Sequence, residues 1–127
     1  MLTDAKPVIL IPTIKKQEAR EFYENVLGLK FKVDDGFALV FETAGIMLRL
    51  TPVHEFTPHP FSVLGWEMED IGGSVNELVE RGVIFERFEF PWMKQDAQGI
   101  WVAPDGTQVA WFKDPDGNLL SIAQHAR

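Results

Sequence analysis

The strongest constraint on this chain is an internal repeat, because the second half of the sequence restates the pattern of the first. In each half an apolar stripe at helical spacing ends at a glycine, Gly28 in the first half and Gly82 in the second. A glycine turn then precedes a strand-like segment at residues 45–50 and again at residues 117–122. A duplication outranks local propensity, so the sequence predicts two copies of one supersecondary unit.

Each copy is predicted to have the order βαβββ, with a first unit over about 7–53 and a second over about 61–124. In the first unit the expected strands are 8–11, buried on both faces, then 29–33, 37–41 and 46–50, with a helix over 19–27. In the second unit the expected helix over 71–79 is capped by Asp70, and the expected strands are 62–68, 83–90, 100–103, 107–112 and 119–122, one strand more than in the first unit. The predicted fold is a single α+β domain, in which a strongly curved mixed sheet encloses a concave cleft and both helices lie on the outer face.

A turn-rich segment over residues 54–60 is expected to connect the two units. It contains His54, Glu55 and His59, which are side chains of types that bind metals. Nothing rigid holds these three groups in one geometry, so a solvated linker is favoured over a metal site.

The composition indicates which partners and which cellular compartment to expect. A net charge of −7 disfavours nucleic acid or an anionic membrane as the main partner. The chain has no cysteine, which fits a reducing cytoplasm, and no signal peptide or membrane-spanning run is visible. We therefore expect a cytoplasmic protein without disulfides.

Three segments resemble one superfamily: FYENVLGL at residues 22–29, EMEDI at 67–71 and DPDGNL at 114–119. They look like the vicinal oxygen chelate superfamily, which contains glyoxalase I, bleomycin-resistance proteins, fosfomycin-resistance enzymes and extradiol dioxygenases. The resemblance runs from about residue 8 to residue 124 and implies the paired βαβββ fold. It does not imply one activity, because members share a scaffold and differ in site chemistry.

The resemblance also implies where a divalent metal would be held, namely by His, Gln or Glu on the first and last strands of each half. At the corresponding positions this chain has Lys6, Arg49, Val63 and Ser121. Two cations, an apolar side chain and a neutral hydroxyl do not make a transition-metal site. We therefore expect no metal and no other cofactor.

Alternation along the strands predicts which side chains line the cleft instead. The candidates for binding a ligand are Met47, Arg49, Val63, Glu67, Trp92, Trp101, Trp111 and Ser121. Each tryptophan has core packing as its simpler interpretation, Arg49 is either a surface cation or an anion anchor, and Glu67 is either solvated or a cation binder.

The function favoured by these observations is metal-independent binding of a small organic molecule by a homodimer, resembling the bleomycin-resistance branch. One alternative is a metal-dependent lyase, isomerase or dioxygenase that uses unrecognised ligands. A second alternative is a protein-interaction or regulatory domain that uses the same cleft.

Overall fold

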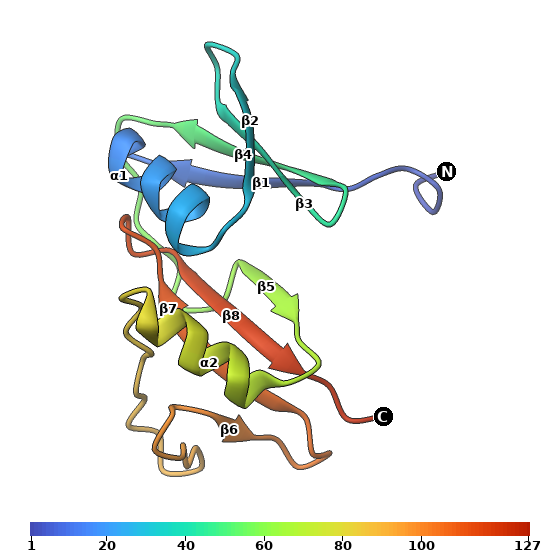
Figure 1. The fold of residues 1–127 in the computed structure, drawn as a ribbon, viewed down its shortest axis with the longest axis vertical. Helices are drawn as coiled ribbons and strands as arrows, with labels where there is room; N and C mark the ends of the chain where they lie inside the picture. The colour runs from blue at the N-terminus through green and yellow to red at the C-terminus, as the bar shows by residue number, and fades with distance from the viewer. The chain divides into compact units, whose positions relative to one another are not determined.

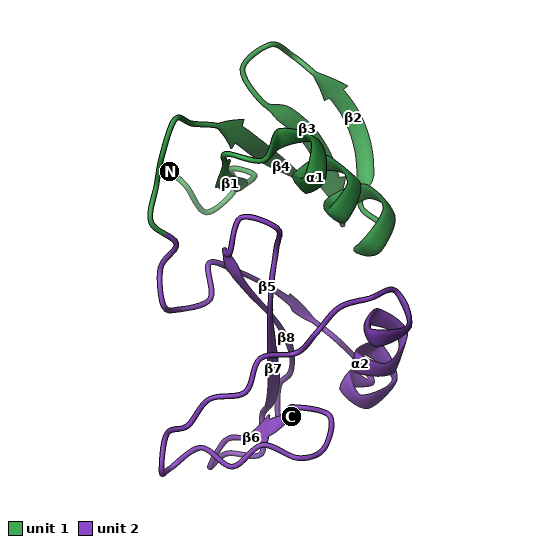
Figure 2. Cartoon of the chain, turned by 90° about the vertical axis from the view of Figure 1, so that its left-hand side faces the viewer, with its two compact units in different colours: residues 1–57 green, residues 58–127 purple.

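The computed structural model describes residues 1–127 as two compact units, residues 1–57 and residues 58–127 (Figures 1 and 2). Each unit contains one four-stranded mixed sheet and one helical segment. No helix is both long and apolar enough to cross a membrane.

In the first unit the sheet has the order β1-β4-β3-β2, and β1 runs parallel to β4. The helix α1 leads into a π-helical turn η1, where the amide of Leu27 donates to the carbonyl of Phe22. Gly28 follows with a φ of 74°, as the sequence predicts for the end of this helix. The bounds are β1 Val8–Thr13, α1 Lys16–Glu21, η1 Phe22–Val26, β2 Lys30–Asp34, β3 Leu39–Thr43 and β4 Ile46–Pro52.

The helical segment covers one face of this sheet and forms the core of the unit there. Tyr23, Phe41, Leu48 and Leu50 are fully buried, and the Tyr23 and Phe41 rings lie 6.1 Å apart. Because side chains alternate along β4, Arg49 lies on the opposite face from Leu48 and Leu50. The first sheet therefore has one buried face and one open face.

The prediction that residues 8–11 are buried on both faces is wrong. Ile11 is buried, but Val8 is 48% exposed and Leu10 is 68% exposed. The reason is that β1 lies at the edge of the sheet and α1 covers only one side of it. The same edge position explains why β1 continues through Pro12, since an edge strand tolerates a residue without an amide proton.

The second unit repeats the arrangement, with sheet order β5-β8-β7-β6 and β5 parallel to β8 (Figure 1). The duplication predicted from the sequence is therefore confirmed at the level of topology. Asp70 precedes the helix and its carboxylate accepts a hydrogen bond from the Gly73 amide at 3.2 Å, which confirms the predicted cap. The bounds are β5 Leu64–Glu67, α2 Ile71–Glu80, β6 Trp101–Val102, β7 Gln108–Lys113 and β8 Leu119–Gln124.

The strand predicted over residues 83–90 does not form. This segment makes only one isolated bridge to the sheet, Phe85 to Phe112, and the amide of Glu86 donates to the carbonyl of Trp111. The other end of the same β7 edge is occupied by β6, which pairs at Gln108 and Val109. Two segments share one edge, so neither has room for a long ladder.

The turn between β7 and β8 is built by two buried polar side chains. The Asp114 carboxylate accepts hydrogen bonds from the amides of Asp116 and Asn118, both at 2.9 Å, and from the Asn118 side chain. Gly117 supplies the left-handed conformation with a φ of 87°. This turn fixes the register that sets Trp111 opposite Ser121.

Candidate ligand-binding site

Five aromatic rings of the second unit contact one another in a closed circuit, and we call this set the aromatic cluster. Phe88 stacks on Phe90 at 6.0 Å, and Phe90 stacks on Trp92 at 5.5 Å. Trp92 meets Trp101 edge-on at 5.8 Å, Trp101 lies 6.1 Å from Trp111, and Trp111 meets Phe88 edge-on at 5.4 Å. Trp92 is 64% exposed and Phe90 is 50% exposed, so the cluster opens to solvent on one side.

The cluster lies on the face of the second sheet that α2 does not cover. Phe112 and Leu120 are fully buried, whereas their neighbours Trp111 and Ser121 are only partly buried. Because side chains alternate along a strand, Trp111 and Ser121 share the open face. The structure thus brings together four of the candidates predicted from the sequence: Trp92, Trp101, Trp111 and Ser121.

Gln95 holds the segment that carries Phe88 and Phe90. Its side-chain oxygen accepts from the Phe88 amide at 2.8 Å, and its side-chain nitrogen donates to the carbonyls of Glu86 and Gly99 at 2.9 and 2.8 Å. The Gln95 side chain therefore supplies hydrogen bonds to the backbone of a segment that does not pair as a strand. Sequence reasoning missed Gln95, Phe88 and Phe90 as contributors, and the signal for the two phenylalanines was their period of two along the chain.

Two hydroxyl groups lie beside the aromatic cluster. Ser121 Oγ and Ser62 Oγ are 2.8 Å apart, and Ser62 Oγ donates to the Leu64 carbonyl at 3.1 Å. Strand alternation predicted Val63 rather than Ser62 for this position. The chain bends at Val63 just before β5 begins, so alternation does not extend back to it, and Ser62 contacts Ser121 instead.

Glu67 contacts the end of the chain rather than the aromatic cluster. Its carboxylate accepts from the His125 amide at 2.9 Å and also forms a very short contact with the His125 ring. These hydrogen bonds from the His125 side chain and backbone hold the pKa of the Glu67 carboxyl below its usual range. Glu67 is therefore already paired within its own unit.

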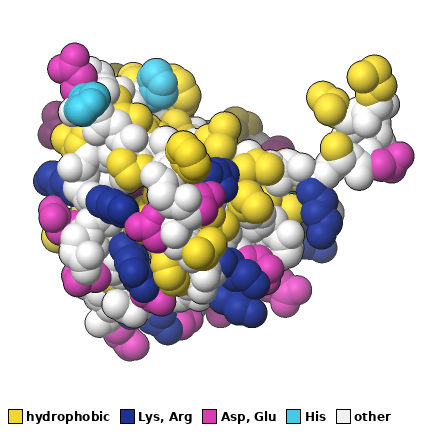
Figure 3. All heavy atoms as spheres, turned by 90° about the horizontal axis from the view of Figure 1, so that it is seen from above, with side chains coloured by type: hydrophobic (Ala, Val, Ile, Leu, Met, Phe, Trp, Pro, Cys, Tyr) yellow, Lys and Arg dark blue, Asp and Glu magenta, His cyan; other side chains and the backbone are white.

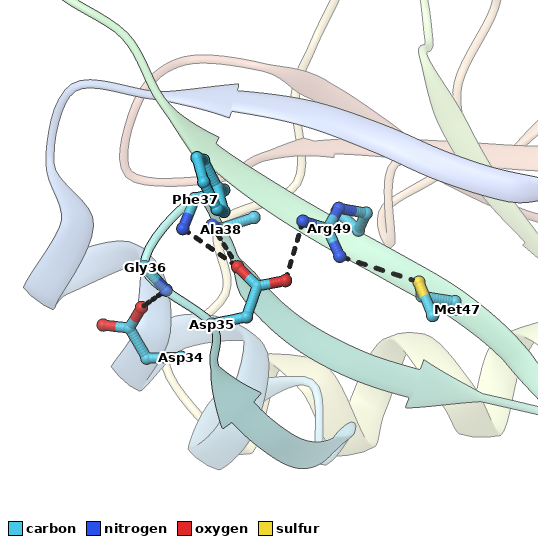
Figure 4. A network of polar contacts seen from close by, with 7 residues as sticks. All are labelled: Asp34, Asp35, Gly36, Phe37, Ala38, Met47 and Arg49. Atoms are coloured by element: carbon cyan, nitrogen blue, oxygen red, sulfur yellow. Dashed lines mark hydrogen bonds and ion pairs between the residues drawn. The ribbon is translucent and has the colours of Figure 1, made fainter.

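Arg49 and Met47 lie on the open face of the first sheet (Figure 4). Arg49 forms an ion pair with Asp35 at 2.9 Å, and a second guanidinium nitrogen is 3.9 Å from the Met47 sulfur. Asp35 also accepts from the amides of Phe37 and Ala38, both at 2.9 Å. These two backbone hydrogen bonds, and then the bond from Arg49, hold the pKa of Asp35 below its usual range.

An open depression of about 460 Å³ lies next to Met47 on the first unit, and Lys6, Val8 and Glu42 are among the residues that line it. Its lining is mostly apolar.

On the molecular face shown in Figure 3, hydrophobic side chains lie between acidic and basic ones, and no continuous basic area forms.

Comparison with known proteins decides the family. A sequence model of the Glyoxalase/Bleomycin resistance protein/Dioxygenase superfamily matches residues 8–122. The chain belongs to this superfamily. The match runs through both units and agrees with the resemblance found in the sequence. A search of curated protein sequences gave no match.

Solved structures of superfamily members share the fold. A Sphaerobacter thermophilus DSM 20745 member matches with a TM-score of 0.72 and 20% identity, covering 98% of this chain and 100% of that one. An Alicyclobacillus acidocaldarius protein of the superfamily gives 0.71 and 18%, covering 98% and 93%. Lactoylglutathione lyase from Agrobacterium tumefaciens gives 0.69 and 17%, covering 98% and 96%.

This superfamily member does not offer the donor set of a metal site. The superfamily resemblance placed Lys6 and Val63 at the metal-ligand positions of the first strand in each half, but both residues precede their strands. In the observed register Leu10 lies beside Arg49, and Gly65 lies beside Ser121. Neither the positions that the resemblance implies nor the residue pairs in the observed register supply an imidazole or a carboxylate. No group of three or more His, Asp or Glu side chains that could hold a metal ion is present elsewhere. The residues present do not fit a transition metal.

Proposed function

We propose that this superfamily member binds a small organic molecule on the aromatic cluster of its second unit, without a catalytic metal. The observation that carries the proposal is the circuit of five rings, two of which are at least half exposed. Large exposed aromatic side chains that contact one another are typical of recognition surfaces rather than of ordinary surface. A flat ligand stacked on them would bury apolar area and gain about 0.5–1.5 kcal/mol per ring pair.

The composition of the two parallel strand pairs supports the metal-independent part of this proposal. Leu10, Gly65 and Ser121 cannot replace carboxylate or imidazole ligands, and Arg49 carries a charge that repels a cation. These residues therefore do not provide the metal ligands that a metal-dependent lyase, isomerase or dioxygenase would need. Saturable binding of a small aromatic compound distinguishes a small-molecule binder from a protein-interaction domain.

The experiment measures binding of norharmane, a planar tricyclic heteroaromatic compound, by calorimetry and by the shift it causes in the melting temperature. We expect saturable binding to the wild type and at least tenfold weaker binding to a Trp92→Ala variant. Phe37→Ala is the matched control, because Phe37 is an aromatic residue that is 81% exposed and lies in the other unit. Equal binding by the wild type and both variants would contradict the proposal.

We further propose that the two units form one domain and that the protein is a homodimer. The single superfamily match across both units supports the first statement. The exposed apolar side chains of the first sheet, Val8, Leu10 and Met47, support the second, since an uncovered sheet edge and face favour association. Sedimentation at micromolar concentration tests the dimer, and a purely monomeric profile would contradict it.

A further inference from the structure

The two hydroxyl groups beside the aromatic cluster form a directed chain of hydrogen bonds. Ser62 Oγ lies within hydrogen-bond distance of two oxygens, the Leu64 carbonyl at 3.1 Å and Ser121 Oγ at 2.8 Å. A carbonyl oxygen can only accept, and a serine hydroxyl has one proton. The arrangement that satisfies both contacts has Ser62 donating to Leu64 and Ser121 donating to Ser62.

This direction determines what Ser121 can offer to a ligand. In this arrangement its only proton points at Ser62, so its remaining capacity toward the open face consists of lone pairs. Ser121 pairs in register with Trp111, and directly opposed side chains on one sheet face lie about 4.5–5.5 Å apart. A polar edge of a ring stacked on Trp111 would therefore meet a hydrogen-bond acceptor.

Gly65 keeps this geometry possible. Gly65 lies beside Ser121 in the parallel pair, and a Cβ added at Gly65 would lie 2.7 Å from Ser121 Oγ. Any other residue at this position would displace the hydroxyl from Ser62. The glycine, the two serines and the Leu64 carbonyl thus act together to orient one oxygen.

We propose that the ligand of the aromatic cluster is a planar molecule that presents an N–H or O–H donor to Ser121, and that the Ser62–Ser121 pair makes the site reject ligands with an acceptor at that edge. The inference rests on the proposed function and goes beyond it by naming the ligand class. A ligand acceptor would face the lone pairs of Ser121 and lose its hydrogen bond to water, which is the basis of the discrimination. Ser62 is a positioning residue, since it acts only through Ser121.

The test compares two compounds that share one planar tricyclic skeleton. Norharmane carries a ring N–H, and azafluorenone carries a ketone oxygen at the same edge. We expect the wild type to bind norharmane roughly fivefold or more tightly than azafluorenone, as one net hydrogen bond allows. Ser121→Ala should remove this preference, because it deletes the acceptor.

The Ser62→Ala variant tests whether Ser62 orients the Ser121 proton, because a purely structural role of Ser62 would not change the relative affinity for the two compounds. Without Ser62 the Ser121 proton is free to turn toward the ligand, so affinity for azafluorenone should rise while affinity for norharmane changes little. Ser74→Ala is the matched control, because Ser74 is a serine of the same unit whose hydroxyl donates to the Asp70 carbonyl at the start of α2. This control should keep the wild-type preference.

The outcomes separate this inference from the proposed function. Equal affinity for the two compounds, or a preference for the ketone, would overturn the inference; if Trp92→Ala still weakened binding of both, the proposed function would stand. No binding of either compound by the wild type would overturn both. A preference that survives Ser121→Ala would also overturn the inference, because the discrimination would then come from another group.

Discussion

At the scale of single residues, the surroundings of Arg49 favour one of its two interpretations. The guanidinium is already paired with Asp35, and its side chain is 25% exposed. An additional anion would have to compete with a carboxylate that two backbone amides and Arg49 orient together. Arg49 of β4 is therefore better described as the partner of Asp35 in the β2–β3 turn than as an anchor for an anionic ligand (Figure 4).

This assignment predicts an order of stabilities. Arg49→Met removes one partner of Asp35, whereas Asp35→Ala removes every hydrogen bond that the carboxylate accepts in the turn. We expect Asp35→Ala to lower the midpoint of urea denaturation clearly more than Arg49→Met does, since a partly exposed ion pair contributes little. Equal midpoints for the two variants would show that the backbone contacts of Asp35 are unimportant.

The contact between Glu67 and His125 predicts a pH dependence. Folding lowers the pKa of Glu67, so its contribution to stability is complete above the unfolded pKa and is lost as the pH falls through the folded pKa. We expect acidification through this range to release residues 125–127, seen as faster exchange of the His125 amide. Glu67→Gln should show fast exchange already at neutral pH, whereas the neighbouring Glu69→Gln should behave as wild type.

At the scale of elements, the parts that local chemistry determines could be predicted and those that depend on competition could not. The Asp114–Asn118 turn and the helix that Asp70 caps follow from short side chains that bond nearby amides, and both are present. Residues 83–90 have the composition of a strand, but β6 occupies part of the edge they would need. Which of the two apolar segments pairs with β7 depends on the packing of the whole unit, so the periodicity of the sequence alone cannot predict this pairing.

The same limit explains what was missed in the candidate site. Trp92, Trp101, Trp111 and Ser121 could be found because tryptophans and strand alternation are visible in the sequence. Ser62 and Gln95 act through a bend and through a side chain that bonds the backbone, respectively, and neither leaves a periodic signal. Met47, Val63 and Glu67 were chosen by the same alternation and lie outside the aromatic cluster.

The role of Gln95 predicts the consequence of losing it. Gln95→Ala removes three hydrogen bonds to the backbone, and we expect the free energy of unfolding to fall by about 1–3 kcal/mol. The near-ultraviolet circular dichroism of the tryptophans should also weaken, because Phe88 and Phe90 lose their support. Gln17→Ala is the control, since the Gln17 side chain makes one exposed hydrogen bond to Glu21. An unchanged aromatic spectrum in Gln95→Ala would contradict this role.

At the scale of the whole molecule, the duplication explains why the fold was more predictable than the function. Two units with the same strand order follow from two copies of one pattern, and the superfamily match covers both. The side chains on the open faces of the two sheets are not equivalent, however. The first sheet presents Arg49 paired with Asp35, whereas the second presents Ser121 beside the aromatic cluster. The two copies therefore share their strand order but differ in the side chains at these equivalent open-face positions.

The last prediction concerns metal content, since it separates a binder from an enzyme of this superfamily. Protein purified without added metal should carry no stoichiometric transition metal, and adding Zn²⁺, Ni²⁺, Mn²⁺ or Fe²⁺ should produce neither glyoxalase nor ring-cleaving activity. The physical reason is that Leu10, Arg49, Gly65 and Ser121 supply one cation, one neutral hydroxyl and no other side-chain donor. Elemental analysis of the intact protein, with a metal-dependent glyoxalase processed in parallel as the positive control, measures the first statement. One tightly held metal per chain, together with an activity that chelation abolishes, would refute the metal-independent proposal and favour the enzyme.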